Sequence, residues 1–413
     1  MSTIVTAHPA SQSGAIPAAS SEATKPPSRN VAIDAYRGLV MLLMMAEVLR
    51  LAAIHRSFPG SLFWSILAFN QTHVEWAGLG LHDMIQPSFT FLVGVALPYS
   101  TQSRIRKGQS FGRLLLHSLW RSVVLIALGI LLRSLHSTQT NFTFEDTLTQ
   151  IGLGYTFAVL ISFAKPRWQW GLFAAILFGY WLAWAIYPAP GAGFDYAAVG
   201  VPANWQHNFT GFAAHWNKNS NLGQAFDVWF LNLFPRPKPF LYNGGGYLTL
   251  SFIPTLGTML LGVFAGQRLR STPEKSALRY FVRLGNLLIV VAFMLNLTGI
   301  CPIVKRIWTP SWTLFSGGLC LLALAFFCWF VNVKGHQRAV FPLVVVGTNS
   351  LAAYLIAHLW EDFLTTNLHT NLGYRVFNLF GAPFEPLVMG FTILLIYWLA
   401  LYWMYRNKIF LRI

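Results

Sequence analysis

The segment HVEWAGLGLHDMIQP, residues 73–87, concentrates ionisable side chains in a chain that otherwise carries few charges. His73 is a candidate general base or acyl carrier, because a neutral imidazole can take a proton from an amine or hydroxyl, or accept an acyl group. Such a base needs a partner that sets its tautomer, and Asp83 or Glu75 can supply one. The alternative interpretation is that His73 is a polar anchor where a helix meets the membrane surface.

Two further histidines raise the same question. His82 adjoins Asp83 and cannot share its helix face, so we expect it behind the site or on the surface. His358 lies in the apolar run 341–360, where an ionisable residue is a functional candidate. The alternative interpretation is that His358 is simply a polar residue at the end of a helix.

Two carboxylates, one just before the chain's first apolar segment and one deeper within it, each precede a basic residue by three positions. Asp34 and Arg37 therefore share a helix face and are predicted to form a structural ion pair. Glu47 and Arg50 have the same spacing, and a local pair is the simplest interpretation of them as well.

The composition indicates which elements must position these side chains. Of the 413 residues, 55% are hydrophobic and only 10% are charged, far below the roughly 25% of soluble domains. The apolar runs are continuous rather than alternating, which favours helices over a barrel. We predict an all-α, polytopic membrane bundle of about ten transmembrane helices, at roughly 38–55, 84–100, 114–133, 147–164, 169–187, 247–267, 281–298, 311–331, 341–360 and 387–405.

The charges of the loops predict the topology. Lys and Arg gather in alternate loops, such as the one that holds Arg104, Arg106 and Lys107. The positive-inside rule then places both termini in the cytoplasm and His73 at the non-cytoplasmic face. The long loop 188–245 falls on that same face, where it is either a substrate cap or a decorated surface loop.

Other features exclude whole classes of function. The net charge of +16 is spread between apolar runs instead of forming one patch, so we predict no nucleic-acid partner. The three cysteines have no spacing suited to zinc or to a disulfide framework, and we predict no metal. Residues 1–29, rich in Ala, Ser and Pro, are predicted to be a disordered cytoplasmic tail, with the transmembrane domain at 30–413.

Several motifs, in order, resemble the transmembrane acyltransferases related to heparan-α-glucosaminide N-acetyltransferase. RNVAIDAYRG is similar to the family's D-x-F-R-G start of the first helix. HVEWAGLGLHDMIQPSFTFLVG is similar to its H-x-x-W-x-G segment, with the following Asp and Pro. DTLTQIGLGY, FIPTLGTMLLGVFAGQRL, VKRIWTPSWTLFSGG and GTNSLAAYLIAHLW continue the match to about residue 360. The chain departs from the pattern where many relatives have an asparagine late in the first helix and this one reads AEVLR.

The resemblance implies roles for individual residues. The family's catalytic histidine matches His73, which would act as base or acyl carrier with Asp83 as its orienting partner. Trp76 would form a wall of the pocket and Gln150 a polar contact with substrate. Lys305 and Arg306, basic residues on the predicted outer side, would hold the phosphates of coenzyme A.

The resulting hypothesis is an integral membrane acyltransferase. It would move an acetyl or other acyl group from acyl-CoA, with acetyl-CoA as the donor, to an amino-sugar or glycan-like acceptor at the non-cytoplasmic face. The alternative is a transporter or a lipid- or glycan-handling channel without covalent chemistry. We expect a multi-pass location in a cell inner (plasma) membrane. The sequence leaves the oligomeric state open, a homodimer included.

Overall fold

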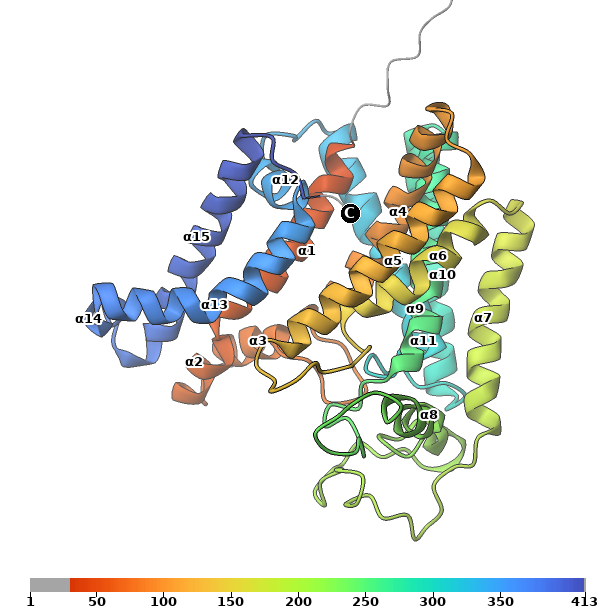
Figure 1. Ribbon diagram of the computed structural model, residues 1–413, viewed down its shortest axis with the longest axis horizontal. Coiled ribbons are helices and arrows are strands. Elements are labelled where there is room, and N and C mark those ends of the chain that lie inside the picture. The colour runs from red at the N-terminus through yellow and green to blue at the C-terminus, as the bar shows by residue number, and fades with distance from the viewer. Residues whose placement is uncertain (1–29, 412–413) are drawn as a thin grey trace, which may run out of the picture. The chain divides into compact units, whose positions relative to one another are not determined.

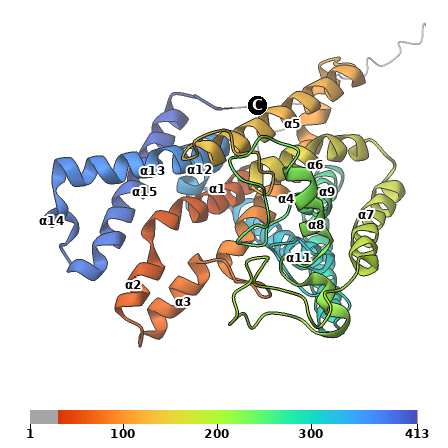
Figure 2. The same ribbon diagram turned by 60° about the horizontal axis from the view of Figure 1, so that its bottom comes forward.

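The computed structural model describes residues 30–411, and the predicted tail of residues 1–29 lies outside them. No strand occurs within 30–411, so the predicted all-α class is confirmed. The long helices surround a common apolar core (Figures 1 and 2). They are α1 (Val31–Met45), α4 (Ile85–Arg106), α5 (Phe111–Ser134), α6 (Thr147–Ser162), α7 (Pro166–Ile186), α9 (Phe252–Ser271), α10 (Glu274–Leu297), α11 (Pro310–Phe327), α13 (Ser350–Leu372) and α15 (Glu385–Arg406).

Shorter elements complete the chain. The α-helical ones are α2 (Leu51–Ser57), α3 (Leu62–Gln71), α8 (Leu222–Leu231), α12 (Phe341–Gly347) and α14 (Tyr374–Phe377). The 3₁₀ turns are η1 (Ala46–Leu49), η2 (Leu81–Met84), η3 (Gly211–Trp216), η4 (Thr249–Ser251) and η6 (Ala382–Phe384), and η5 (Cys328–Val333) is a π-helical turn that ends α11.

The number of membrane spans is smaller than predicted when length and apolar composition decide it. Six helical segments between residues 30 and 411 qualify, or eight if two bent pairs are each one span. The bent pairs are Val31–Leu49 with Leu51–Ser57, and Phe341–Gly347 with Ser350–Leu372. Two predicted spans do not qualify: α6 has only 16 residues, and α4 ends in the polar sequence STQSRIR. The protein is a multi-pass membrane protein, and the count of ten is not confirmed.

Helices α4 and α9 pack at backbone contact. A methyl group added to Gly94 would lie 2.0 Å from the carbonyl oxygen of Met259, and one added to Gly262 would lie 2.0 Å from that of Phe91. Gly266 meets Val95 in the same way. Only glycine permits this approach, as at other close helix crossings in membranes. We call this contact the glycine seam.

Several segments that precede or follow helices meet at one end of the bundle. Segments 72–80, 188–248 and 298–309 lie together there, near α3 and α8 (Figures 1 and 2). The start of α1 and the end of α15 lie at the opposite end (Figure 1). This arrangement agrees with the predicted topology, although the orientation in the membrane stays a prediction.

The segment 188–248 holds a buried shelf of amide side chains. The shelf consists of Asn217, Asn219, Asn221 and Gln224, each no more than 5% exposed. Their amide nitrogens donate chiefly to backbone carbonyls, such as those of Phe209, Val199, Asn217 and Leu241. The side chain of Asn221 also caps α8 by accepting a hydrogen bond from the amide of Gln224.

Candidate active site

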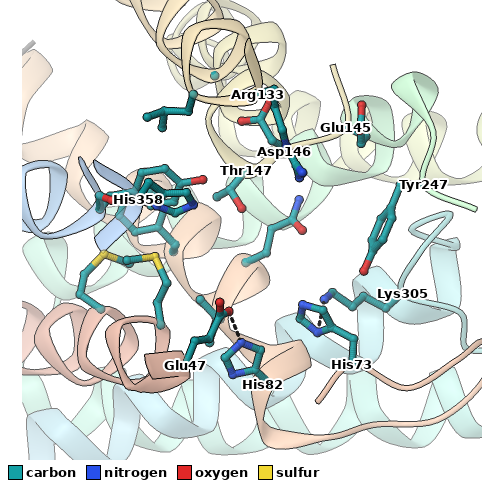
Figure 3. Close-up of a pocket in the computed structure, with 18 residues that line it drawn as sticks. Glu47, His73, His82, Arg133, Glu145, Asp146, Thr147, Tyr247, Lys305 and His358 are labelled. Atoms are coloured by element: carbon teal, nitrogen blue, oxygen red, sulfur yellow. Dashed lines mark hydrogen bonds and ion pairs between the residues drawn. The ribbon is translucent and has the colours of Figure 1, made fainter. Parts of the chain in front are cut away.

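A cavity of about 440 Å³ opens where the ends of several helices meet (Figure 3). Its polar walls come from η1, the 72–80 segment, η2, the end of α5, the segment before α6 and the start of α6, the segment before η4, the 298–309 segment and α13. The lining side chains are those of Met41, Met44, Glu47, His73, His82, Ile85, Gln86, Phe89, Leu132, Arg133, Glu145, Asp146, Thr147, Tyr247, Lys305, Tyr354 and His358, together with Gly129.

His73 forms a compact triangle with Asp83 and Lys305 (Figure 3 shows the histidine and the lysine). His73 Nδ1 lies 2.8 Å from Asp83 Oδ1, and Lys305 Nζ lies 3.1 Å from the same oxygen. Lys305 Nζ also lies 3.0 Å from His73 Nδ1. Asp83 is fully buried and Lys305 is 3% exposed, whereas the His73 side chain is 38% exposed and lines the cavity.

The chemistry of these groups assigns the tautomer of His73. An ionised Asp83 can only accept, so the hydrogen bond at 2.8 Å requires a proton on His73 Nδ1. The ammonium of Lys305 has no lone pair, so its hydrogen bond goes to Asp83 rather than to the protonated nitrogen. His73 Nε2 then carries the lone pair, and it has no hydrogen-bond partner among residues 30–411. This nitrogen is a free base at the cavity.

Local structure holds Asp83 in place. Its second oxygen, Oδ2, accepts from the amides of Gly80, at 2.9 Å, and Val74, at 3.3 Å. An antiparallel bridge between Ala77 and Val304 joins the segment that bears His73 to the segment that bears Lys305. The carboxylate is therefore saturated on both oxygens and cannot turn toward a ligand.

The pKa values of the triangle follow from burial and pairing. Burial alone would raise the pKa of Asp83, but the His73 hydrogen bond and the Lys305 charge outweigh it and lower that pKa to about 2. Burial lowers the pKa of Lys305 to about 8, although Asp83 opposes the change. Burial also lowers the pKa of His73, which the bond to Asp83 offsets only in part. At neutral pH the pair is ionised and His73 is the neutral base.

A second histidine–carboxylate pair lines the same cavity. His82 Nε2 is hydrogen-bonded to Glu47 Oε1, and the two are drawn with a dashed line in Figure 3. The ring centroids of His73 and His82 are 5.0 Å apart.

The predicted local pair of Glu47 with Arg50 was wrong. Arg50 pairs instead with Glu361 at 3.1 Å, because Arg50 has a left-handed backbone conformation that interrupts the helix after Leu49.

The opposite wall of the cavity is also polar. Tyr247 points its hydroxyl toward Lys305 (Figure 3), and burial raises the pKa of this phenol. Arg133 at the end of α5 faces Glu145, whose pKa is raised by burial even though the arginine lowers it. Asp146 caps α6, with Oδ1 accepting from the amides of Leu148 and Thr149.

Two residues predicted to contact substrate, Trp76 and Gln150, do not line the cavity. Trp76 is fully buried, and its indole nitrogen donates to the carbonyl of Trp216. Gln150 is 1% exposed and donates to the carbonyls of Phe144, at 2.6 Å, and Thr249, at 3.1 Å. These side chains support the cavity from behind.

The remaining predicted residues have clear partners. Arg306 donates to the carbonyls of Val74, at 3.1 Å, and Gly245, at 2.8 Å, so its guanidinium ties three segments together. Arg37 lies 3.4 Å from Asp34 at the start of α1, away from the cavity.

The structure also shows where Glu75, the alternative partner of His73, and the long loop 188–245 lie. Glu75 pairs with His207 at 3.0 Å, which leaves Asp83 as the partner of His73. That contact joins the 188–245 loop to the 72–80 segment, yet no described residue of 188–245 lines the cavity itself. The loop therefore contacts the segment that bears His73 without lining the cavity.

The sequence predictions missed several cavity residues. Glu47, Arg133, Glu145, Asp146 and Tyr247 were not candidates, and His82 was expected behind the site or on the surface. A signal existed for some of them. The pair Glu145–Asp146 stands directly before an apolar run. Tyr247 follows three glycines and likewise stands just before an apolar run.

Comparisons with known proteins agree with the predicted resemblance. The chain is 23% identical over 427 residues to heparan-alpha-glucosaminide N-acetyltransferase of Homo sapiens, covering 94% of this chain and 60% of that protein. It is 24% identical over 374 residues to the enzyme of the same name from Mus musculus, covering 80% of this chain and 53% of that one. The chain thus spans little more than half the length of these relatives, and no family model matches it. This all-helical, multi-pass membrane protein is thus similar, over most of its own length, to two proteins named heparan-alpha-glucosaminide N-acetyltransferase.

Proposed function

We propose that the protein is an integral membrane acyltransferase that uses acyl-CoA, with acetyl-CoA as the donor. The acceptor is an amino sugar or a similar glycan, met at the non-cytoplasmic face. The observation that carries this proposal is the free Nε2 of His73 at a cavity, opposite an Nδ1 held by a buried carboxylate. The two named N-acetyltransferases support it.

The arrangement suits direct acyl transfer. The acceptor nitrogen or oxygen attacks the thioester carbon, and His73 Nε2 takes the proton that the acceptor loses. The C–S bond breaks as the thiolate leaves, and the thiolate takes that proton from His73. Asp83 stabilises the imidazolium that exists between the two transfers, since its oxygen lies 2.8 Å from Nδ1.

The same free nitrogen suits a covalent route. In that route Nε2 attacks the thioester and carries the acyl group until the acceptor arrives. In either route the carbonyl oxygen gains negative charge. The hydroxyl of Tyr247, which points toward Lys305 beside His73 (Figure 3), is the donor that we expect to stabilise it.

The charge pattern of the loops supports the placement of both termini in the cytoplasm, and the proposal keeps the plasma membrane as the location. Lys305 and Arg306 have a structural role in this proposal, in place of the predicted binding of coenzyme A phosphates. The ammonium is engaged by Asp83 and the guanidinium by two carbonyls.

The test compares purified wild type with His73→Ala in nanodiscs, using radiolabelled acetyl-CoA. Label retained on wild type and lost in the variant would support the acyl-histidine route. If neither keeps label, release of free CoA with a panel of amino sugars is measured. A loss of about 10²–10⁴-fold in His73→Ala would support direct transfer. Absence of turnover with every donor and acceptor, together with movement of unmodified substrate across the membrane, would favour a transporter.

A further inference from the structure

The cavity contains two histidine–carboxylate pairs where acyl transfer to a neutral acceptor needs only one. His73 pairs with Asp83, and His82 pairs with Glu47 across 35 positions of sequence. Both pairs line the cavity through at least one member, and their imidazole rings are 5.0 Å apart (Figure 3). The second pair has no role in the mechanism described above.

The two pairs are built in opposite ways. In the first, the carboxylate is buried and the imidazole is exposed to the cavity, because Asp83 is fully buried and the His73 side chain is 38% exposed. In the second, the His82 side chain is 6% exposed and that of Glu47 is 57% exposed. His82 bonds one oxygen of Glu47, and the other oxygen has no partner among the described residues. The second pair therefore presents a carboxylate oxygen to a ligand.

The charges around the cavity leave Glu47 uncompensated. Asp83 is paired with Lys305, and Asp146 is engaged by the first amides of α6. The charge of Arg133 favours the ionised form of Glu145, whose pKa it lowers. Glu47 thus remains as the anion that a ligand must complement, and a cation is the complementary ligand.

The groups that face Glu47 come from four elements. These groups are His82 of η2, His73 of the 72–80 segment, His358 and Tyr354 of α13, and Lys305 of the 298–309 segment. Helix α15 packs against η1 and carries its charges only at its two ends, at Glu385 and Arg406. Lys305 is the lysine in this set, and its ammonium is already engaged by Asp83.

We propose that Glu47, held by His82, binds the acceptor as an ammonium and that this pair removes its first proton. The inference rests on the proposed acyltransferase function and names the acceptor's charge state and a second proton acceptor. Acylation of an ammonium displaces two protons from one nitrogen. The first passes to the Glu47–His82 pair and then to water, which leaves the free amine. The second passes to His73 as the C–N bond forms and goes on to the departing thiolate as the C–S bond breaks. The sum is ammonium plus thioester giving amide, thiol and one released proton.

The test is the pH profile of kcat/KM for glucosamine, measured with full-length protein in nanodiscs at saturating acetyl-CoA. We expect Glu47→Gln to lose about 10²-fold at about pH 6, where the amine is protonated. The loss should shrink toward none at about pH 9, because an amine with a pKa of about 8 is then already free. His82→Gln should show the same pH dependence with a smaller loss.

Two controls make the result specific. Glu361→Gln removes a glutamate of the same type that pairs with Arg50 outside the cavity, and it should follow the wild-type profile. The Kd of each variant for acetyl-CoA should match that of wild type, since the pair acts on the acceptor. A loss in Glu47→Gln that is equal at all pH values would indicate a structural role and overturn the proposal. So would a profile identical to that of wild type. Absence of CoA release by wild type would instead overturn the acyltransferase function itself.

Discussion

The cavity and the amide shelf are both rich in polar side chains, but they use them differently. In the shelf, the amides of Asn217, Asn219 and Gln224 donate to backbone carbonyls of their own segment. In the cavity, side chains pair with each other, and His73 and Glu47 each keep an atom without a partner in the described chain. Polar density alone thus fails to identify a site. Unpaired atoms occur in both regions, because the side-chain oxygens of Asn219 and Gln224 also lack a hydrogen-bond partner, but those oxygens are buried. The useful criterion is whether an unpaired polar atom belongs to a side chain that lines a cavity.

The largest effect should come from Asp83→Asn. An amide can present its oxygen or its nitrogen to His73, so the tautomer with a free Nε2 is no longer enforced. We expect kcat per folded molecule to fall by about 10²-fold or more. Steady-state CoA release measures this. The variant also takes the buried partner from Lys305, so its stability should fall as well. Glu75→Gln, which breaks the surface contact with His207, should leave kcat within about twofold; an equal loss in both variants would contradict the assignment of Asp83.

A second effect should come from Lys305→Met, and it concerns pH. The Lys305 charge lowers the pKa of His73, so its removal raises that pKa. More His73 is then protonated at neutral pH, and the acidic limb of the kcat/KM profile should move to higher pH. The variant also leaves Asp83 buried without its cation. Removing one partner of a buried ion pair lowers the free energy of unfolding by about 3–5 kcal/mol.

The matched control for this variant is Lys107→Met, which removes an exposed lysine in the turn after α4. Its profile and its melting temperature should equal those of wild type. An acidic limb that stays in place in Lys305→Met would show that Lys305 does not tune His73.

A smaller effect, on stability alone, is expected for Gln150→Ala. This side chain resembles those of the shelf, because its amide donates to two carbonyls behind the cavity. Its loss leaves those buried acceptors unpaired, at about 1–3 kcal/mol. Thermal unfolding in nanodiscs should show the change, while kcat per folded molecule stays near the wild-type value. A fall in kcat with unchanged melting would instead restore Gln150 as a substrate contact.

The smallest effect should come from Arg50→Ala. Arg50 pairs with Glu361 at 3.1 Å, but both side chains are partly exposed. Exposed pairs of this kind contribute less than about 1 kcal/mol. The melting temperature should change little and turnover should not change. A large loss of turnover would show that the bend after η1 positions Glu47. Residues that position the cavity from outside would then have to be added to the comparison of cavity and shelf.

Some of these features could be predicted from the sequence because they depend on nearby residues. The all-α class follows from continuous apolar runs, and the partnership of His73 with Asp83 spans only ten positions. The contacts of Lys305 could not be found in this way, because 232 positions separate it from His73. Glu47 was assigned to Arg50 because a straight helix was assumed, whereas the chain bends by 41° after Leu49. Trp76 and Gln150 have the right residue types, but only packing shows that they face away from the cavity.

The glycine seam determines how the protein tolerates substitutions far from the cavity. Asp83 stands just before α4 and Tyr247 just before α9, so the contact of Gly94 and Gly262 sets how far apart these two walls can lie. A substitution there would touch no reacting group, yet its Cβ would lie 2.0 Å from a backbone carbonyl and would force the two helices apart. A screen of random mutants should therefore find changes at Gly262 that lower activity although no residue that lines the cavity is altered.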